Sequence, residues 1–327
     1  MPLVNYRHLG RPEAHIDLRA PPAERWRAFG RDYADELHSL LRDIVVLSEE
    51  HFQGIPRLFQ PLARAAAHGT SRVAGRAFAA VAGWYGSEYI AEIKGLAAAA
   101  DAPFSQVFLA NLIYDLTQFS DRWADACACS SFSCNVRGRP VLARNMDWCW
   151  PDSVGRHTVL VRFHHGRKSY LSIGVVGLVG VLTAMHKGHL AVALNQAPAQ
   201  RLPFNAMQWP ALHRLRAACD GFGTFGGFVR RLTACQTMSP FFAHIVGVRP
   251  EEQLVVGGMG REFAVRRKTA KALVQTNHFV DDDLEHLNPP DEFVDADGGR
   301  WTPGPATRRY SDGYVSCRDP CANRWPS

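Results

Sequence analysis

Several patterns that mark common functional classes are missing from this chain of 327 residues. It has no Gly-x-Ser-x-Gly elbow, which argues against a serine nucleophile of the α/β-hydrolase kind. No Cys-x-x-Cys pair accompanies the histidines, and the adjacent His164 and His165 would point to opposite faces of a strand, so we expect no metal site. The glycines of segment 174–180 lack the spacing of a dinucleotide fingerprint, and we expect no cofactor.

Long apolar runs and blocks of one charge are also missing. No apolar run approaches about 18 residues, so no membrane span is expected. The first residues lack the apolar core of a secretory signal, and we therefore expect a cytoplasmic protein. The net charge of +6 comes mostly from scattered arginines without interleaved aromatics, which disfavours nucleic-acid binding and leaves transient contact with a membrane surface open.

Cysteine usage points in a different direction. Eight cysteines in this length are too few for a disulfide framework, and four of them lie between positions 127 and 149. In a reducing compartment such clustering suggests catalysis or metal binding rather than bridges. Cys219 and Cys235 lie in helical apolar contexts and are expected in the core. The terminal Cys317 and Cys321 would form a small loop only in an oxidising setting.

The character of the chain changes near residue 128. Before it, apolar spacing and alanine content predict helices almost throughout, including segments 58–82 and 88–100 and a helix capped by Ser105. After it, short β-branched segments separated by turns predict a sheet with two helices, at 209–218 and 225–233. The fold class is therefore α+β. The predicted strands are 159–163, 170–173, 175–183, 190–194, 243–248, 253–256 and 272–275.

A hairpin is predicted at this change of character. Segment 130–136 is mostly β-compatible, Arg137-Gly138-Arg139 supplies a turn, and a second strand starts at Pro140. In such a hairpin, the returning strand brings Arg144 and Asp147 back towards a cysteine at the start of the first strand. A thiol nucleophile tuned by a cation and a carboxylate needs this arrangement.

These motifs resemble the cysteine N-terminal-nucleophile (Ntn) hydrolases of the acid ceramidase and N-acylethanolamine acid amidase type, which are related to choloylglycine hydrolases and penicillin acyltransferases. The family's nucleophile is followed by two hydroxyl residues, which Cys129-Ser130-Ser131 matches and Cys127-Ala128-Cys129 does not. The similar segments occur in the family's order: 16–26, 92–97, 111–116, 129–132, 143–147, 177–183, 190–195 and 275–279.

The resemblance implies an αββα sandwich preceded by a mostly helical N-terminal segment. It also implies a precursor that cuts its own Ala128–Cys129 peptide bond, dividing the chain into a helical pro-segment, residues 1–128, and a catalytic unit, residues 129–327. The cut creates an α-amine on the nucleophile, with a reference pKa of about 7.7–8.0, that can act as general base. The two fragments would remain together as an α/β heterodimer.

The resemblance also assigns roles to the site residues. Cys129 would attack the substrate carbonyl and form a thioester. Arg144 would favour the thiolate and orient the carbonyl, and Asp147 would hold the α-ammonium group. Asn277 and Asn195 would donate hydrogen bonds to the oxyanion. Arg308 corresponds to a late arginine of the family, with its neighbour Arg309 as the alternative.

Three functions follow from these expectations. The first is an amidohydrolase acting on a small-molecule N-acyl amide, such as an N-acylethanolamine or a ceramide-like lipid, with apolar helices of segment 30–120 forming a mouth for the acyl chain. The second is an acyltransferase that passes the acyl group to an amine. The third is a non-catalytic scaffold with the same fold, which the complete set of site residues disfavours.

Overall fold

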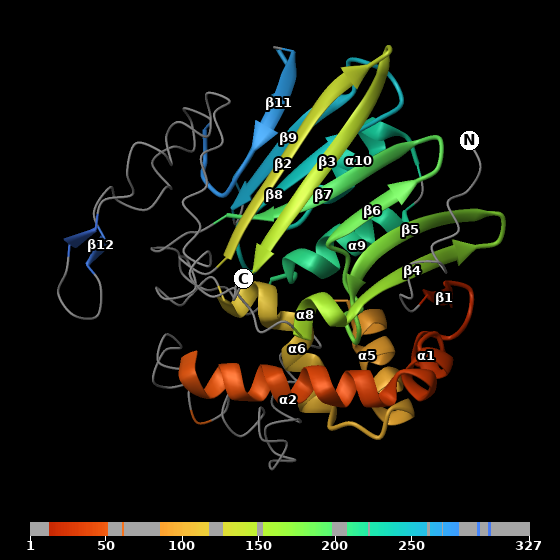
Figure 1. Cartoon of the computed structure of the whole chain (residues 1–327). Coiled ribbons are helices and arrows are strands. Elements are labelled where there is room, and N and C mark those ends of the chain that lie inside the picture. Colours follow the sequence, from red (N-terminus) through yellow and green to blue (C-terminus); the bar gives the residue numbers. More distant parts are fainter. Residues whose placement is uncertain are drawn as a thin grey trace, which may run out of the picture.

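The structure is a computed structural model of the whole chain, and its main part combines two stacked sheets with helices (Figure 1). The α+β class expected from the sequence is confirmed. The residues that the structure describes are 13–51, 61, 86–117, 127–148, 153–197, 208–221, 223–259, 262–269, 271–280, 293–294 and 300–301.

The larger sheet has eight strands in the order β1-β4-β5-β6-β7-β8-β9-β10. β1 is parallel to β4, and the other neighbours are antiparallel. Short connections join most of these antiparallel neighbours, whereas residues 197–240 lie between β7 and β8. The strands are β1 (Glu13–Asp17), β4 (Thr158–His165), β5 (Lys168–Val175), β6 (Thr183–His186), β7 (Leu190–Gln196), β8 (Phe241–Val246), β9 (Gln253–Met259) and β10 (Glu262–Arg267).

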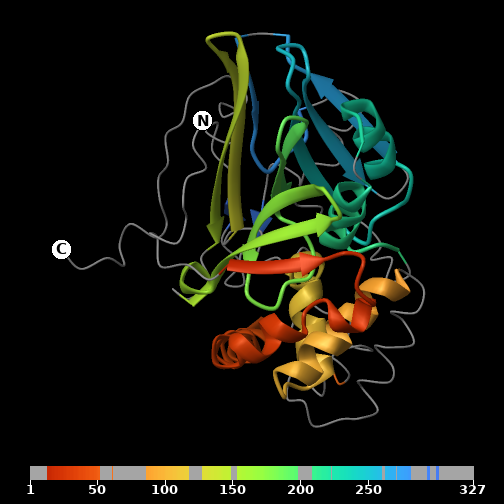
Figure 2. The ribbon, with the colours of Figure 1, turned by 90° about the vertical axis from the view of Figure 1, so that its right-hand side faces the viewer.

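The smaller sheet contains the predicted hairpin. It has three antiparallel strands in the order β11 (Ala272–Gln275), β2 (Cys127–Val136) and β3 (Arg139–Trp148). β2 and β3 contact β7 and β8, so the two sheets lie face to face, as Figure 2 shows edge-on. A separate pair is formed by β12 (Phe293–Val294) and β13 (Arg300–Trp301).

Helices cover the large sheet and form a base below both sheets (Figures 1 and 2). α9 (Ala211–Asp220) and α10 (Phe225–Leu232) lie on the face of the large sheet that is turned away from the small one. Within the described residues no helix covers the outer face of the small sheet. The base consists of η2 (Pro22–Glu24), α1 (Arg27–Asp32), α2 (Ala34–His51), α5 (Ser87–Ala99) and α6 (Phe104–Thr117), and the short α8 (Ser153–Arg156) precedes β4.

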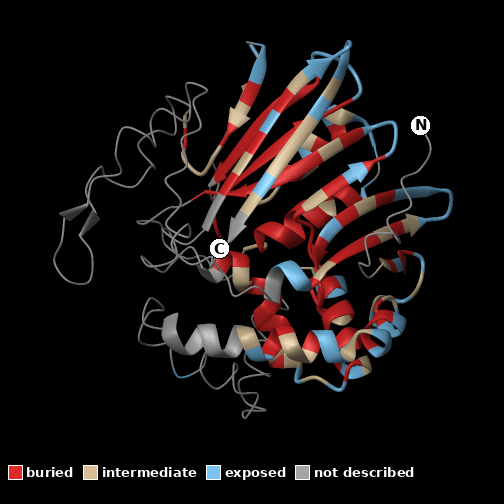
Figure 3. Cartoon of the chain, viewed as in Figure 1, coloured by how far each residue is buried: buried red, intermediate tan, exposed pale blue. Residues whose placement is uncertain are grey.

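The helices and strands have a buried side and a more exposed side (Figure 3). The apolar side chains of the base helices, such as Leu37, Ile93, Leu96 and Phe108, belong to one core cluster with the large sheet. The predicted apolar mouth in segment 30–120 is therefore not formed by these side chains, because they pack inward.

A buried ionic cluster joins the base to α9. The carboxylate of Glu92 in α5 accepts hydrogen bonds from Arg25, Trp26 and Arg216, with Arg25 Nη1 at 2.7 Å and Trp26 Nε1 at 2.6 Å. Arg216 also donates to Asp220, which accepts from Tyr170 as well. Glu92 and Arg216 are fully buried, so this cluster links the first 128 residues to the rest of the chain through paired charges.

One predicted strand is a turn. Residues 177–182 lie between β5 and β6, and Gly177 has a φ of +84°, which a strand does not accommodate. Asn111 in α6 holds this turn, because its side chain donates to Gly177 O at 2.9 Å and accepts from Val179 N at 2.8 Å. The helix expected to be capped by Ser105 starts instead at Phe104.

Candidate active site

The hairpin places a thiol and a guanidinium group between the two sheets. Cys129 pairs with Met146, and Ser131 pairs with Arg144 on the returning strand. Because side chains alternate along a strand, Cys129 and Ser131 share one face of β2. Both side chains are buried, and β2 and β3 contact β7 on this side. The predicted hairpin and its turn are confirmed.

Arg144 is the charged neighbour of the Cys129 thiol. Its Nη2 lies 3.7 Å from Cys129 Sγ and donates to Leu194 O of β7 at 2.8 Å. Its Nε has no hydrogen-bond partner among the described residues. A nearby cation favours a thiolate over a thiol, so the arrangement suits a sulfur nucleophile.

Asn277 lies against the backbone of Cys129. Its Oδ1 accepts a hydrogen bond from Cys129 N at 2.6 Å, and its Nδ2 donates to Gln196 O at 2.7 Å. The carbonyl side of the amide therefore faces the peptide nitrogen of the expected cleavage site. The expected donor to an oxyanion is engaged with Gln196 in this state, and that role of Asn277 remains a prediction.

Asn195 is fully buried next to this group. Its Nδ2 donates to Gln275 O at 2.9 Å, to Ser131 Oγ at 3.1 Å and to Thr276 O at 3.4 Å. Its Oδ1 has no partner among the described residues. The structure thus brings Asn195 to the site through Ser131, and its amide hydrogens are directed to carbonyl and hydroxyl oxygens.

Two of the predicted site residues are not described at the side-chain level. The backbone of Asp147 pairs with Ala128, which puts it beside the expected cleavage site, but its side chain lies outside the described residues. Arg308 and the alternative Arg309 lie outside the described residues altogether, as do Cys317 and Cys321. Their roles remain predictions.

Three residues at the site were not predicted to belong to it: His244, Ser131 and Ser133. His244 of β8 is fully buried; its Nδ1 lies 3.0 Å from Ser131 Oγ and its Nε2 lies 2.9 Å from Ser133 Oγ. The alternation of Cys129, Ser131 and Ser133 along one strand was a readable sign of a polar inner face. A single histidine within the apolar run Phe241–Val246 was the other sign.

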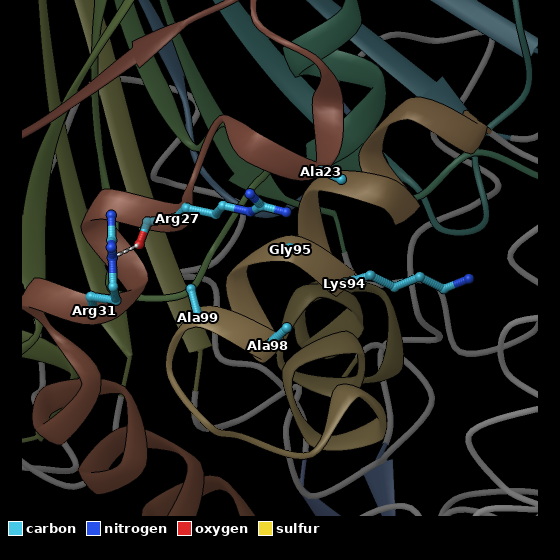
Figure 4. Close-up of a pocket in the computed structure, with 7 residues that line it drawn as sticks. All are labelled: Ala23, Arg27, Arg31, Lys94, Gly95, Ala98 and Ala99. Carbon is cyan, nitrogen blue, oxygen red and sulfur yellow. Dashed lines mark hydrogen bonds between the residues drawn. The ribbon is translucent and has the colours of Figure 1, made fainter.

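A cavity of about 470 Å³ lies away from this group, between η2, α1 and α5 (Figure 4). Arg27, Arg31 and Lys94 line it together with small residues of α5. In Figure 4 Lys94 extends away from Arg27 and Arg31, so the three cations do not converge on one point. None of the site residues lines this cavity.

The described residues contain no group of three or more His, Cys, Asp or Glu side chains that could hold a metal ion. None of the helices in the described part of the chain is long and apolar enough to cross a membrane.

Comparison with known proteins agrees with the motifs. No family model matches the chain. Over 250 residues it is 23% identical to the N-acylethanolamine-hydrolyzing acid amidase of Caenorhabditis elegans, covering 74% of this chain and 65% of the relative. The resemblance to Ntn hydrolases of this type is thereby confirmed, although the match spans slightly less than two thirds of the relative's length.

Two solved structures resemble part of the chain at low sequence identity. An orthologue of the N-acylethanolamine-hydrolyzing acid amidase from Caenorhabditis elegans is 20% identical, with a TM-score of 0.40 over 46% of this chain and 70% of that chain. A conjugated bile acid hydrolase from Clostridium perfringens is 10% identical, with a TM-score of 0.27 over 54% of this chain and 55% of that chain.

Proposed function

We propose that this protein is an autoprocessed cysteine amidohydrolase that cleaves the linear amide bond of an N-acyl lipid through a thioester. The observation that carries the proposal is the geometry at Cys129. Its thiol lies 3.7 Å from Arg144 Nη2, while its peptide nitrogen is held by Asn277 Oδ1. Sulfur, cation and scissile nitrogen thus meet at one residue, and the homologous acid amidase is named for hydrolysing N-acylethanolamines.

In the first step, Cys129 Sγ attacks the carbonyl carbon of Ala128. The C–N bond breaks, the acyl group moves to sulfur, and the nitrogen takes up a proton to become an α-amine. Water then hydrolyses the thioester, which leaves a carboxylate on Ala128 and a free thiol. The hydrogen bond from Cys129 N to Asn277 Oδ1 supports this step because it holds the leaving nitrogen in place.

In the mature enzyme the same sulfur attacks the substrate amide. The new α-amine takes the thiol proton and passes it to the leaving amine, and a thioester with the acyl group remains. Water attacks this thioester, releasing the fatty acid and restoring the thiol. Arg144 stabilises the negative charge on sulfur, and Asp147 is proposed to orient the α-amine.

The fragments are proposed to stay associated after cleavage. Residues 1–128 would contribute Arg25, Trp26 and Glu92 to the ionic cluster, and residues 129–327 would contribute Arg216 and Asp220. Asn111 adds a second link through its two bonds to the turn at residues 177–179.

Intact-mass analysis of purified wild type and Cys129→Ala tests the processing step. We expect wild type to yield fragments 1–128 and 129–327 during incubation at mildly acidic or neutral pH, and Cys129→Ala to remain whole. Cys219→Ala is the matched control, because this thiol is buried in the apolar core. Wild type that never splits would support the scaffold alternative.

Incubation of processed protein with N-acyl amides, with and without an acceptor amine, separates hydrolysis from transfer. We expect free fatty acid as the main product in both cases. A transamidated product that dominates whenever the amine is present would indicate the acyltransferase alternative. Hydrolysis that persists in Cys129→Ala would contradict the mechanism.

A further inference from the structure

A line of hydrogen bonds crosses from the large sheet to the small sheet next to Cys129. It starts at His244 in β8, whose Nδ1 lies 3.0 Å from Ser131 Oγ in β2. Ser131 Oγ accepts from Asn195 Nδ2 of β7 at 3.1 Å. Residues from three strands of two sheets are therefore joined through polar atoms in a buried layer.

The line continues to the residue that holds Cys129. Asn195 Nδ2 also donates to the carbonyls of Gln275 and Thr276, the two residues that precede Asn277. Asn277 Oδ1 in turn accepts from Cys129 N. Displacement of the Asn195 amide would remove this donor from Thr276 O and leave Gln275 O with only the longer side-chain bond from Ser131 Oγ at 3.4 Å, so it would loosen the segment that carries Asn277.

The surroundings of His244 keep this line neutral. Burial, together with the nearby charge of Arg266, lowers the pKa of His244 to about 3. Ser131 and Ser133 from β2 occupy the two ring nitrogens. A neutral imidazole has one donor and one acceptor nitrogen, so it can bond both hydroxyls without any buried charge.

We propose that His244 and Ser131 are positioning residues: they orient the Asn195 amide, which holds the Gln275–Asn277 turn so that Asn277 stays on the nitrogen of Cys129. Neither residue touches the reacting atoms. The kinetic consequence rests on the proposed amidase function, whereas the positioning itself does not.

Ser133 provides a matched control within the same network. Ser131 and Ser133 are both buried serines of β2 bonded to His244, but only Ser131 is bonded to Asn195 and, at 3.4 Å, to Gln275 O. Ser131→Ala and Ser133→Ala therefore remove the same group at similar depth. Loss of general stability would affect both variants alike, and loss of positioning would affect Ser131→Ala far more.

Amide hydrogen exchange measured by mass spectrometry tests the positioning without any turnover. Both serine changes are made in Cys129→Ala, which retains the peptide nitrogen and stays uncut. We expect the peptide covering residues 275–279 to exchange at least about tenfold faster in the Ser131→Ala background and to be nearly unchanged with Ser133→Ala. Equal exchange of this peptide in the two variants would overturn the proposal.

Kinetics of the serine variants made in the chain that retains Cys129 give the second measurement. We expect Ser131→Ala to slow self-cleavage, and to lower kcat for the amide by about 10–100-fold with KM changed less than about threefold, because small displacements from attack geometry cost rate rather than affinity. Ser133→Ala should lose much less. If wild type itself is inactive, the amidase function fails, and the exchange measurement still decides the positioning.

Substitution of His244 distinguishes its two nitrogens. The amide of Asn reaches about as far as Nδ1, and the amide of Gln reaches about as far as Nε2. His244→Asn should therefore keep the Ser131 contact and hold exchange of residues 275–279 near wild type, whereas His244→Gln should speed it. Faster exchange in His244→Asn than in His244→Gln would contradict the conclusion that the contact of Nδ1 with Ser131, rather than that of Nε2 with Ser133, positions residues 275–279.

Discussion

The two buried polar regions of this molecule are built differently. In the cluster around Glu92, both carboxylate oxygens and all three guanidinium nitrogens of Arg216 have partners. In the layer around Cys129, Arg144 Nε, Asn195 Oδ1 and Gln196 Oε1 have none among the described residues. An unsatisfied buried polar atom costs about 1–3 kcal/mol of folding free energy. The layer around Cys129 therefore carries a cost in stability that the cluster around Glu92 avoids.

This contrast distinguishes a cluster that stabilises the fold, around Glu92, from a layer that is proposed to carry the reaction, around Cys129. A fully paired cluster holds elements together, and removal of one member leaves the others unpaired. Polar atoms that stay unpaired beside a nucleophile can bind groups that arise only during a reaction. Changes in the cluster should therefore reduce stability, and changes in the layer should reduce activity.

Removal of the central carboxylate should have the largest effect. We expect Glu92→Ala to lower the free energy of unfolding by about 3–5 kcal/mol, because Arg25 and Arg216 lose their shared buried anion. Urea unfolding in the Cys129→Ala background measures this without interference from cleavage. Glu92→Gln, which keeps the shape, should cost less than Glu92→Ala. A loss below about 1 kcal/mol for Glu92→Ala would remove the distinction between the two regions.

Removal of the site cation should show the opposite pattern. We expect Arg144→Gln to reduce kcat/KM by about 100-fold or more, equivalent to about 2.7 kcal/mol, with little change in the urea midpoint. Arg144 Nη2 is the group next to Cys129 Sγ, whereas no carboxylate is bonded to Arg144 among the described residues. Full activity with a lowered urea midpoint would assign Arg144 to the supporting class.

Asp115 in α6 tests an intermediate case, a buried acid to which no cation is bonded among the described residues. Its Oδ1 accepts from Ser239 Oγ at 2.5 Å and from Ala211 N at 3.1 Å, and burial raises its pKa to about 7. The folded state thus binds a proton that the unfolded state has released between about pH 4 and pH 7. The stability contributed by Asp115 is present below pH 4 and is lost as pH rises through 7, by up to about 4 kcal/mol.

Asp115→Asn should remove this dependence. We expect the stability of the variant relative to wild type to increase between pH 4 and pH 7, measured as the difference in unfolding free energy at each pH. Taking the difference cancels the contributions of His213 and His244, whose pKa values burial lowers to about 3 in both proteins. A difference that does not change with pH would show that Asp115 keeps its charge when buried.

An exposed ion pair should give the smallest effect. Arg249 Nη2 lies 2.7 Å from Glu252 Oε1, but the arginine side chain is 66% exposed. We expect Arg249→Ala to cost less than about 1 kcal/mol, because water screens the pair. A cost as large as that of Glu92→Ala would mean that burial is not what distinguishes the ionic cluster.

The residues nearest in sequence were the ones that could be predicted. The hairpin follows from β-compatible residues on both sides of Arg137-Gly138-Arg139, and it determines that Arg144 returns to the level of Ser131. The choice of Cys129 over Cys127 came from its two following hydroxyl residues, and it stays a prediction. The strand expected at residues 175–183 was wrong because Asn111, 66 positions before Gly177, holds that segment as a turn.

The rest was decided by the stacking of the sheets. His244 is 113 positions from Ser131, and Asn277 is 148 positions from Cys129. No local sequence pattern predicts that the residues of either pair are in contact. Their contact requires β2 and β11 to lie over β7 and β8 in one register. By itself the sequence determined the hairpin that carries Cys129 and the cation, Arg144, that returns along it, because backbone pairing in a short hairpin is local. Only the tertiary structure decided what surrounds that thiol, because those hydrogen bonds form only once the two sheets pack together.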